Sequence, residues 1–228
     1  MAFFAKIKAG FQKDLETMKS LPFRKKLGFI FDYYKGYFFI LLCLCLLGYY
    51  IGETVAEIRN ETVLEGFFCN DDEDLFPAKA LARDFSAYLG LGKGQQVIFD
   101  DTLYVIPQSG AEYNTASQGK VVAYIAAREL DFLVTTRELV ESYAPNCPVM
   151  DLELFLPADM RERLQGQLLY MADGSGEVKA CGLSMDGSRF TKDSQAQKEA
   201  PHYLMVFSYT RHQDAMLQFL RYAFEMEE

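Results

Sequence analysis

Apolar and polar positions follow three different patterns along this chain. Near the start, apolar residues recur every three or four positions, as on one face of a helix that Pro22 would end: Phe4, Ile7, Phe11, Leu15 and Met18. Residues 36–52 then contain no charged side chain, and the rest of the chain is made of short apolar runs between polar turns. These patterns predict a short amphipathic helix, a continuous apolar helix and a folded domain.

The uncharged segment 36–52 is close to the length of a membrane span. A spanning helix needs about 20 predominantly apolar residues, and this segment has seventeen uncharged residues, at the short end of that length. Aromatic side chains typical of the lipid headgroup region stand at its two edges: Tyr33, Tyr34, Tyr37, Tyr49 and Tyr50. We therefore predict one transmembrane helix over residues 36–52.

Charge is distributed unevenly on the two sides of this segment. Met1 to Gly52 contain eight Lys and Arg but three Asp and Glu, a net charge of +5, so the whole-chain charge of −9 leaves −14 for the remainder. By the positive-inside rule the N-terminus is cytoplasmic and the C-terminal region lies outside the cell membrane. A cleaved signal peptide is the alternative, because Thr54-Val55-Ala56 resembles a cleavage site, but the preceding basic region of about 35 residues favours a retained anchor.

The chain is thus expected to have four parts. Residues 1–35 form a basic cytoplasmic segment, 36–52 the transmembrane helix, 53–62 a polar stalk and 63–228 an extracytoplasmic domain. The amphipathic face within residues 1–35 fits the surface of the lipid bilayer and fits a helix of another membrane protein equally well.

Strand-like and helix-like patterns alternate in the outer region. Expected strands are 63–69, 96–100, 103–106, 131–136, 167–171, 177–183 and 202–208. Expected helices are one capped by Asn70 and the acidic run Asp71–Asp74 and ending near Leu89, one from Thr115 or Ser117 to Leu130, and those over 137–143, 157–164 and 214–224. The alternation predicts an α/β fold with helices on the faces of a mostly parallel sheet, into which the hairpin 167–183 is inserted.

Several segments carry a resemblance to a known group of proteins. They are "IFDYYKGYFFI", "GKVVAYIAARELDFLVTTRELVESYA", "CGLSMDGSRF" and "PHYLMVFSYTRHQDAMLQFLRYAF". The chain resembles uncharacterised bacterial single-pass membrane proteins whose outer part is similar to the type 2 periplasmic-binding-protein fold, that of extracellular solute-binding proteins. In that family a helix leads into a strand that begins near an aspartate, here Asp131, and a polar turn, here Tyr209 to Gln213, joins a late strand to the last helix.

The resemblance implies a ligand cleft beside the ends of strands. The residues it places there are Asn70, Asp71, Thr135, Thr136, Ser208 and Tyr209. Ligands of open α/β sheets bind at the carboxyl ends of the strands, which indicates the same positions. Thr136 has a second interpretation, because it precedes a helix and fits the role of its N-cap.

Residues suited to catalysis or to metal binding are sparse. His202 and His212 have no Cys or carboxylate at metal-ligand spacing and are expected at the surface, and the acidic run after Asn70 lacks the glycine and the alternating ligands of a calcium loop. No serine stands in a nucleophile-elbow sequence. We expect no enzyme, metal or cofactor, and the acidic outer region argues against a nucleic-acid partner.

Two functions remain. One is a tethered, non-catalytic binding module for a small solute or peptide. The alternative is a structural or regulatory partner subunit of another membrane protein, which keeps the fold without a ligand.

Overall fold

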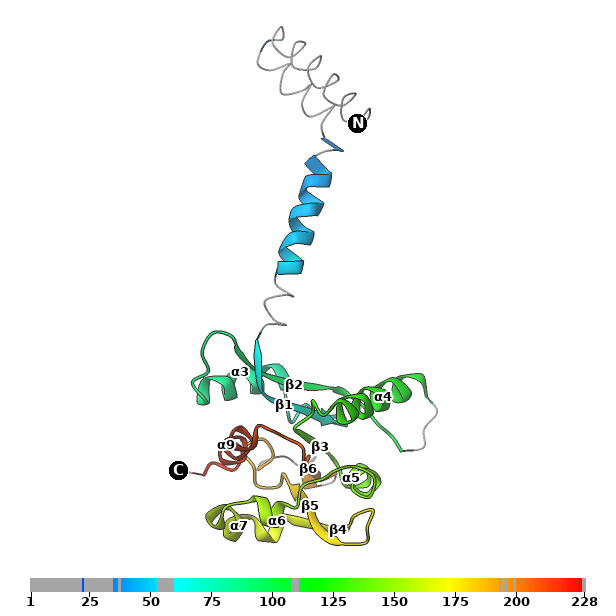
Figure 1. Ribbon diagram of the computed structural model, residues 1–228, viewed down its shortest axis with the longest axis vertical. Coiled ribbons are helices and arrows are strands. Elements are labelled where there is room, and N and C mark those ends of the chain that lie inside the picture. Colours follow the sequence, from blue (N-terminus) through cyan, green and yellow to red (C-terminus); the bar gives the residue numbers. More distant parts are fainter. Residues whose placement is uncertain are drawn as a thin grey trace. The chain divides into compact units, whose positions relative to one another are not determined.

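The computed structural model describes residues 22, 35–36, 38–52, 60–107, 111–192, 194, 197–198 and 200–226. The chain divides into two units, Met1–Arg59 and Asn60–Glu228 (Figure 1). The expected amphipathic helix and the stalk before Asn60 lie outside the described residues. The last two residues of the expected stalk, Glu61 and Thr62, already belong to the first strand, β1 (Glu61–Cys69).

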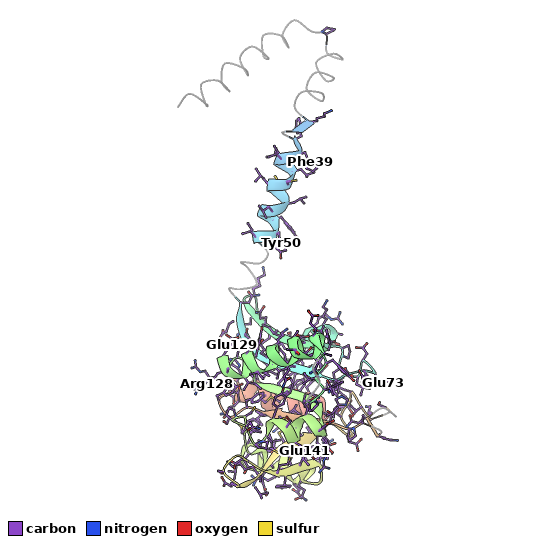
Figure 2. The ribbon with its side chains drawn as sticks, turned by 90° about the vertical axis from the view of Figure 1, so that its right-hand side faces the viewer. Phe39, Tyr50, Glu73, Arg128, Glu129 and Glu141 are labelled. Atoms are coloured by element: carbon purple, nitrogen blue, oxygen red, sulfur yellow. The ribbon has the colours of Figure 1, made fainter. Side chains whose placement is uncertain are left out.

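Within the first unit, residues 38–52 are helical. The side chains of this helix are exposed all around it, including Phe39 and Tyr50 near its two ends (Figure 2). Across the residues that the structure describes, no helix combines the length and the apolarity that a membrane crossing requires.

The second unit is built on one six-stranded sheet with the order β2-β1-β3-β6-β5-β4. Besides β1, its strands are β2 (Gln95–Leu103), β3 (Phe132–Thr136), β4 (Leu168–Ala172), β5 (Val178–Ser184) and β6 (His202–Val206). β1 pairs in parallel with β2 and β3, whereas the pairs β3–β6, β6–β5 and β5–β4 are antiparallel. The α/β fold is confirmed, but the sheet is mixed and the expected mostly parallel sheet is wrong.

Connections explain where the sheet changes direction. Parallel strands need long crossovers, and α3 (Ala78–Tyr88) and α4 (Glu112–Ala127) supply them after β1 and after β2. The tight turn between β4 and β5 confirms the expected hairpin, which lies at the edge of the sheet rather than inside it. Alternation of helices and strands in a sequence does not record strand direction, so the antiparallel placement of β6 could not be read from it.

Helices cover both faces of the sheet (Figure 1). The remaining helices are α5 (Arg137–Tyr143), α6 (Leu152–Phe155), α7 (Ala158–Leu164) and α9 (Gln213–Ala223), with a 3-10 turn η1 (Gln165–Gln167). Successive side chains of a strand point to opposite faces. Phe68 and Val134 accordingly pack with α3, α6, α7 and α9, while Phe67 and Leu133 pack with α4 and α5.

Four elements differ from expectation. The helix α4 spans Glu112–Ala127, whereas the expected helix runs from Thr115 or Ser117 to Leu130. One continuous strand, β2, replaces the two expected over 96–106, and the short helix α6 was not expected. The helix α3 begins at Ala78 rather than at the acidic run, and its first N–H donates to the carboxylate of Asp101 on β2, 2.8 Å away. Because that cap comes from a neighbouring strand, the local sequence gave no sign of it.

A glycine at the centre of the sheet makes room for an aromatic ring. Gly66 on β1 pairs with Phe132 on β3, and a Cβ at position 66 would lie 2.1 Å from Cζ of the Phe132 ring. The ring itself stacks on Phe219 of α9 with centroids 4.9 Å apart. The ring of Phe132 therefore contacts both β1 and α9.

Candidate functional site

The antiparallel direction of β6 separates the six residues that the sequence predicts for a cleft. Asn70 and Asp71 follow β1, and Thr135 and Thr136 end β3. Because β1 and β3 are parallel, these four residues lie together at the carboxyl ends of the two strands. β6 is antiparallel to β3, so Ser208 and Tyr209, which follow β6, lie at the opposite end of the strands. The structure does not bring the six together.

Asn70 and Asp71 are engaged in local structure. Asn70 has a left-handed backbone with φ of 63°, and its amide group accepts from the N–H of Val105 at 2.7 Å and donates to its carbonyl at 2.8 Å. The carboxylate of Asp71 accepts from the N–H groups of Leu75 and Phe76 at 2.8 and 2.7 Å. Both side chains thus use their polar groups for hydrogen bonds with the protein backbone.

The two threonines differ in burial. Thr135 is fully buried, and its hydroxyl has no hydrogen-bond partner among the described residues. Thr136 occupies the N-cap position of α5, but its side chain makes no capping hydrogen bond. It lines a pocket of about 350 Å³, together with Asn70, Asp72, Tyr104, Val105, Ile106, Pro107, Arg137, Glu138, Ala200 and Pro201.

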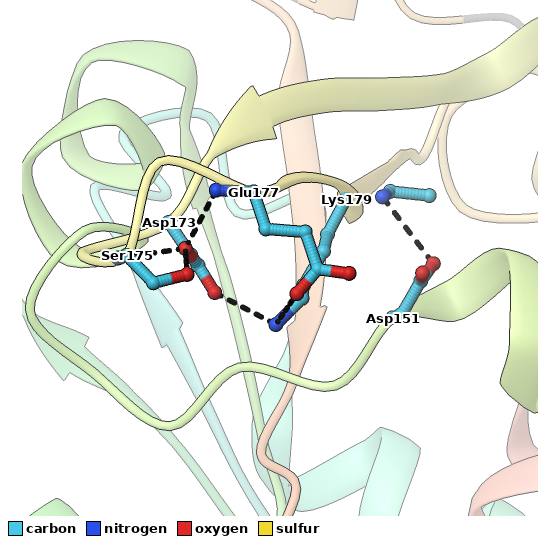
Figure 3. Close-up of polar contacts among 6 residues, drawn as sticks. Asp151, Asp173, Ser175, Glu177 and Lys179 are labelled. Atoms are coloured by element: carbon cyan, nitrogen blue, oxygen red, sulfur yellow. Dashed lines mark hydrogen bonds and ion pairs between the residues drawn. The ribbon is translucent and has the colours of Figure 1, made fainter.

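Ser208 lines a smaller pocket of about 200 Å³ beside the β4–β5 turn, with Cys147, Cys181, Asp173 and Lys179 among its neighbours. Figure 3 shows the polar groups of this turn. Asp173 accepts from the ammonium group of Lys179 at 2.7 Å and from Ser175, which hold the pKa of its carboxyl far below the usual range. The charged side chains that this turn contributes to the pocket, Asp173 and Lys179, are thus paired with each other, which leaves few polar groups for a ligand.

A larger pocket, of about 630 Å³, lies at the end of the sheet where β1 begins and β6 ends. Its lining combines residues of β1, of the end of α4 and its connection to β3, and of the β6–α9 turn: Thr62, Glu65, Ala127, Arg128, Glu129, Asp131, Tyr209, Arg211 and His212. We call it the Glu65 pocket. Of the six residues that the sequence predicts for a ligand cleft, Tyr209 alone lines this pocket.

Asp131 organises the wall of the Glu65 pocket. This buried carboxylate accepts from the backbone N–H of Glu65 at 2.8 Å, from Nδ1 of His212 at 2.9 Å and from the hydroxyl of Thr210. Since a carboxylate accepts, this geometry assigns the ring proton to Nδ1 of His212. One side chain thus joins β1, the start of β3 and the turn that leads into α9.

Glu65 is the acid that sequence reasoning missed. It is only 9% exposed, and burial together with the neighbouring carboxylates of Glu129 and Asp131 raises the pKa of its carboxyl to about 7. Lys120 and His212 act in the opposite direction. The signal was present in the segment VLEGFFC, where one charged residue interrupts an otherwise apolar strand.

The histidines also differ from expectation. His202 is buried rather than at the surface, with Nε2 3.0 Å from the carbonyl oxygen of Asn70 and Nδ1 without a partner among the described residues. His212 is partly exposed and paired with Asp131. Within the described part of the chain, no three His, Cys, Asp or Glu side chains are grouped to hold a metal ion.

The Glu65 pocket therefore joins a buried acid, an Asp–His pair and two arginines, Arg128 and Arg211, within a volume that suits a small molecule. Figure 2 shows Arg128 extending away from the body of the domain. Comparison with known proteins found no matching family model, no similar curated protein and no similar solved structure.

Proposed function

We propose that this chain is a membrane-tethered, non-catalytic binding module that takes a small solute or peptide outside the cytoplasm, in the Glu65 pocket. The observation that carries the proposal is the convergence of charged side chains from three parts of the chain on one pocket of about 630 Å³. Ligand pockets in proteins have volumes of roughly 300–1,000 Å³ and a few well-placed polar groups. Acids with a shifted pKa are concentrated at such sites.

The tether is supported by the sequence. The uncharged segment 36–52, its aromatic edges and the basic residues before it are the features of a single-pass anchor with the N-terminus in the cytoplasm. The apolar side chains of residues 38–52 have no protein cover within the described chain, and lipid would cover them.

A screen of thermal stability tests the proposal. The full chain, purified in detergent, is heated with a library of small solutes and short peptides. A ligand present at 100 times its dissociation constant adds about 2.7 kcal/mol to the free energy of unfolding, a rise of roughly 5–10 °C in Tm for a domain of this size. A library that produces no such rise contradicts the binding function.

One observation favours the alternative of a partner subunit. Leu154 on α6 is 81% exposed and lies next to Glu153, which accepts from the hydroxyl of the exposed Tyr170 on β4, the edge strand of the sheet. Exposed apolar side chains beside a free strand edge suit a protein partner. An empty screen, together with loss of copurifying protein on Leu154→Lys, would support this second function.

A further inference from the structure

The buried Glu65 and the partly buried Tyr209 are residues of the Glu65 pocket wall whose side-chain polar groups have no hydrogen-bond partner among the described residues. Both backbone groups of Glu65 pair with Asp131: its N–H donates to the carboxylate, and its carbonyl accepts from the Asp131 N–H at 2.9 Å. Among the described residues, the structure gives the carboxyl oxygens of Glu65 no hydrogen bond and no ion pair. The residue as a whole is nine-tenths buried and lines the pocket, so its carboxyl group is largely removed from solvent but open to a group bound there.

The cationic side chains nearest to Glu65 have other partners, so its carboxyl group is available to a ligand. Asp131 is already committed to His212 and Thr210, and Lys120 on α4 is paired with Asp100. Glu129 lies on the rim, as do Arg128 and Arg211. Of the two buried acids in the lining, Glu65 is therefore the one whose carboxyl has no ion pair in the described structure, while Glu129 is exposed to solvent.

We propose that the Glu65 carboxylate is the counter-ion for a protonated amino group of the bound solute or peptide. This assignment rests on the proposed function and names the chemistry of its ligand. An ammonium group donates hydrogen bonds and brings the opposite charge, which together satisfy a desolvated carboxylate. A metal ion would require about three protein ligands, and the described residues provide no such group.

Proton exchange accompanies this binding. In the free pocket the carboxyl of Glu65, with a pKa of about 7, is about half protonated at neutral pH. An incoming ammonium group favours the carboxylate, so the proton leaves to solvent while the amine keeps its own. No covalent bond of the ligand changes. A ligand that offers only acceptors would instead favour the protonated acid and would take up a proton.

Calorimetric titration of the full chain in detergent with butylammonium chloride tests the assignment, with 1-butanol as the uncharged probe of the same shape. Alkylamines stay protonated across pH 6–8, so affinity follows the ionised fraction of Glu65 and rises about tenfold from pH 6 to pH 8. Titrations in two buffers of different ionisation enthalpy show proton release at pH 7. Glu65→Gln loses the affinity and the proton release, whereas Glu112→Gln, which removes an exposed acid at the start of α4 outside the pocket lining, keeps the affinity and its rise with pH.

Four results would overturn the assignment: no binding of butylammonium, equal affinity for butanol, tighter binding at pH 6 than at pH 8, or unchanged binding by Glu65→Gln. None of them decides the proposed function, because a screened ligand whose binding is blocked by filling the pocket would still establish that the pocket is a binding site.

Discussion

Glu65 couples the stability of the domain to pH. Its carboxyl has a pKa of about 7 in the folded chain against 4.5 ordinarily, so the folded state prefers the protonated acid. The stabilisation that this preference provides is complete below pH 4.5 and is lost as the pH rises through 7. The shift corresponds to about 3 kcal/mol.

We predict that Glu65→Gln flattens this pH dependence. Between pH 4.5 and 8 the free energy of unfolding of the wild-type chain falls by about 3 kcal/mol more than that of the variant, because glutamine remains neutral throughout. The chain has no tryptophan, so urea unfolding is followed by tyrosine fluorescence. Equal slopes for the two proteins would show that Glu65 is not the titrating group.

Asp131 is expected to be the most costly acid to remove. Asp131→Ala leaves the Glu65 N–H, Thr210 and His212 without their acceptor and lowers the free energy of unfolding by about 3 kcal/mol. Asp84→Ala is the control, because it removes an exposed carboxylate whose one ion pair, with Arg83, contributes at most about 1 kcal/mol. Similar losses in the two variants, measured by urea unfolding, would refute the role given to Asp131.

Neither acid's environment could be read from the sequence alone. Asp131 was placed correctly at the start of a strand, but its partner His212 is 81 residues away. Such a pair is defined by the sheet order, which depends on strand direction. In the folded chain Asp131 meets the turn from Tyr209 to Gln213 through Thr210 and His212.

At the scale of elements, apolar periodicity predicted most helices and strands, because it reflects which side of each element is buried. The strands β1, β3 and β6, the β4–β5 hairpin and the helices α5 and α9 lie where it indicates. The start of α3 was missed because its cap comes from Asp101, and the cleft residues were grouped wrongly because β6 is antiparallel.

The contact between β1 and the ring of Phe132 makes the glycine on β1 sensitive to substitution. Gly66→Ala places a methyl group against a ring that is held by Phe219 and other aromatic side chains, so we expect a loss of about 1–3 kcal/mol. Gly119→Ala is the control, since that position lies inside α4 with open space around it, and alanine there adds up to about 1 kcal/mol. Urea midpoints that move in the same direction for both variants would contradict this packing.

At the scale of the whole molecule, the charge asymmetry predicts which side of the membrane each end occupies. A cysteine introduced by Lys13→Cys should be protected from an impermeant thiol reagent in intact cells, and one introduced by Ser194→Cys should react. The unsubstituted chain gives the background of the five native cysteines. Labelling at position 13 but not at 194 would reverse the proposed topology.

The central claim is that the Glu65 pocket binds a ligand, and filling the pocket tests it most directly. Ala127 lines the pocket and is exposed near the end of α4, so tryptophan there occupies the cavity without entering the core. Ala126→Trp, at the neighbouring exposed position that is not part of the pocket lining, is the matched control. With the dissociation constant of a screened ligand as the measurement, Ala127→Trp should weaken binding at least tenfold, a loss of about 1.4 kcal/mol, while Ala126→Trp leaves it unchanged. Full affinity in Ala127→Trp would show that the ligand binds elsewhere.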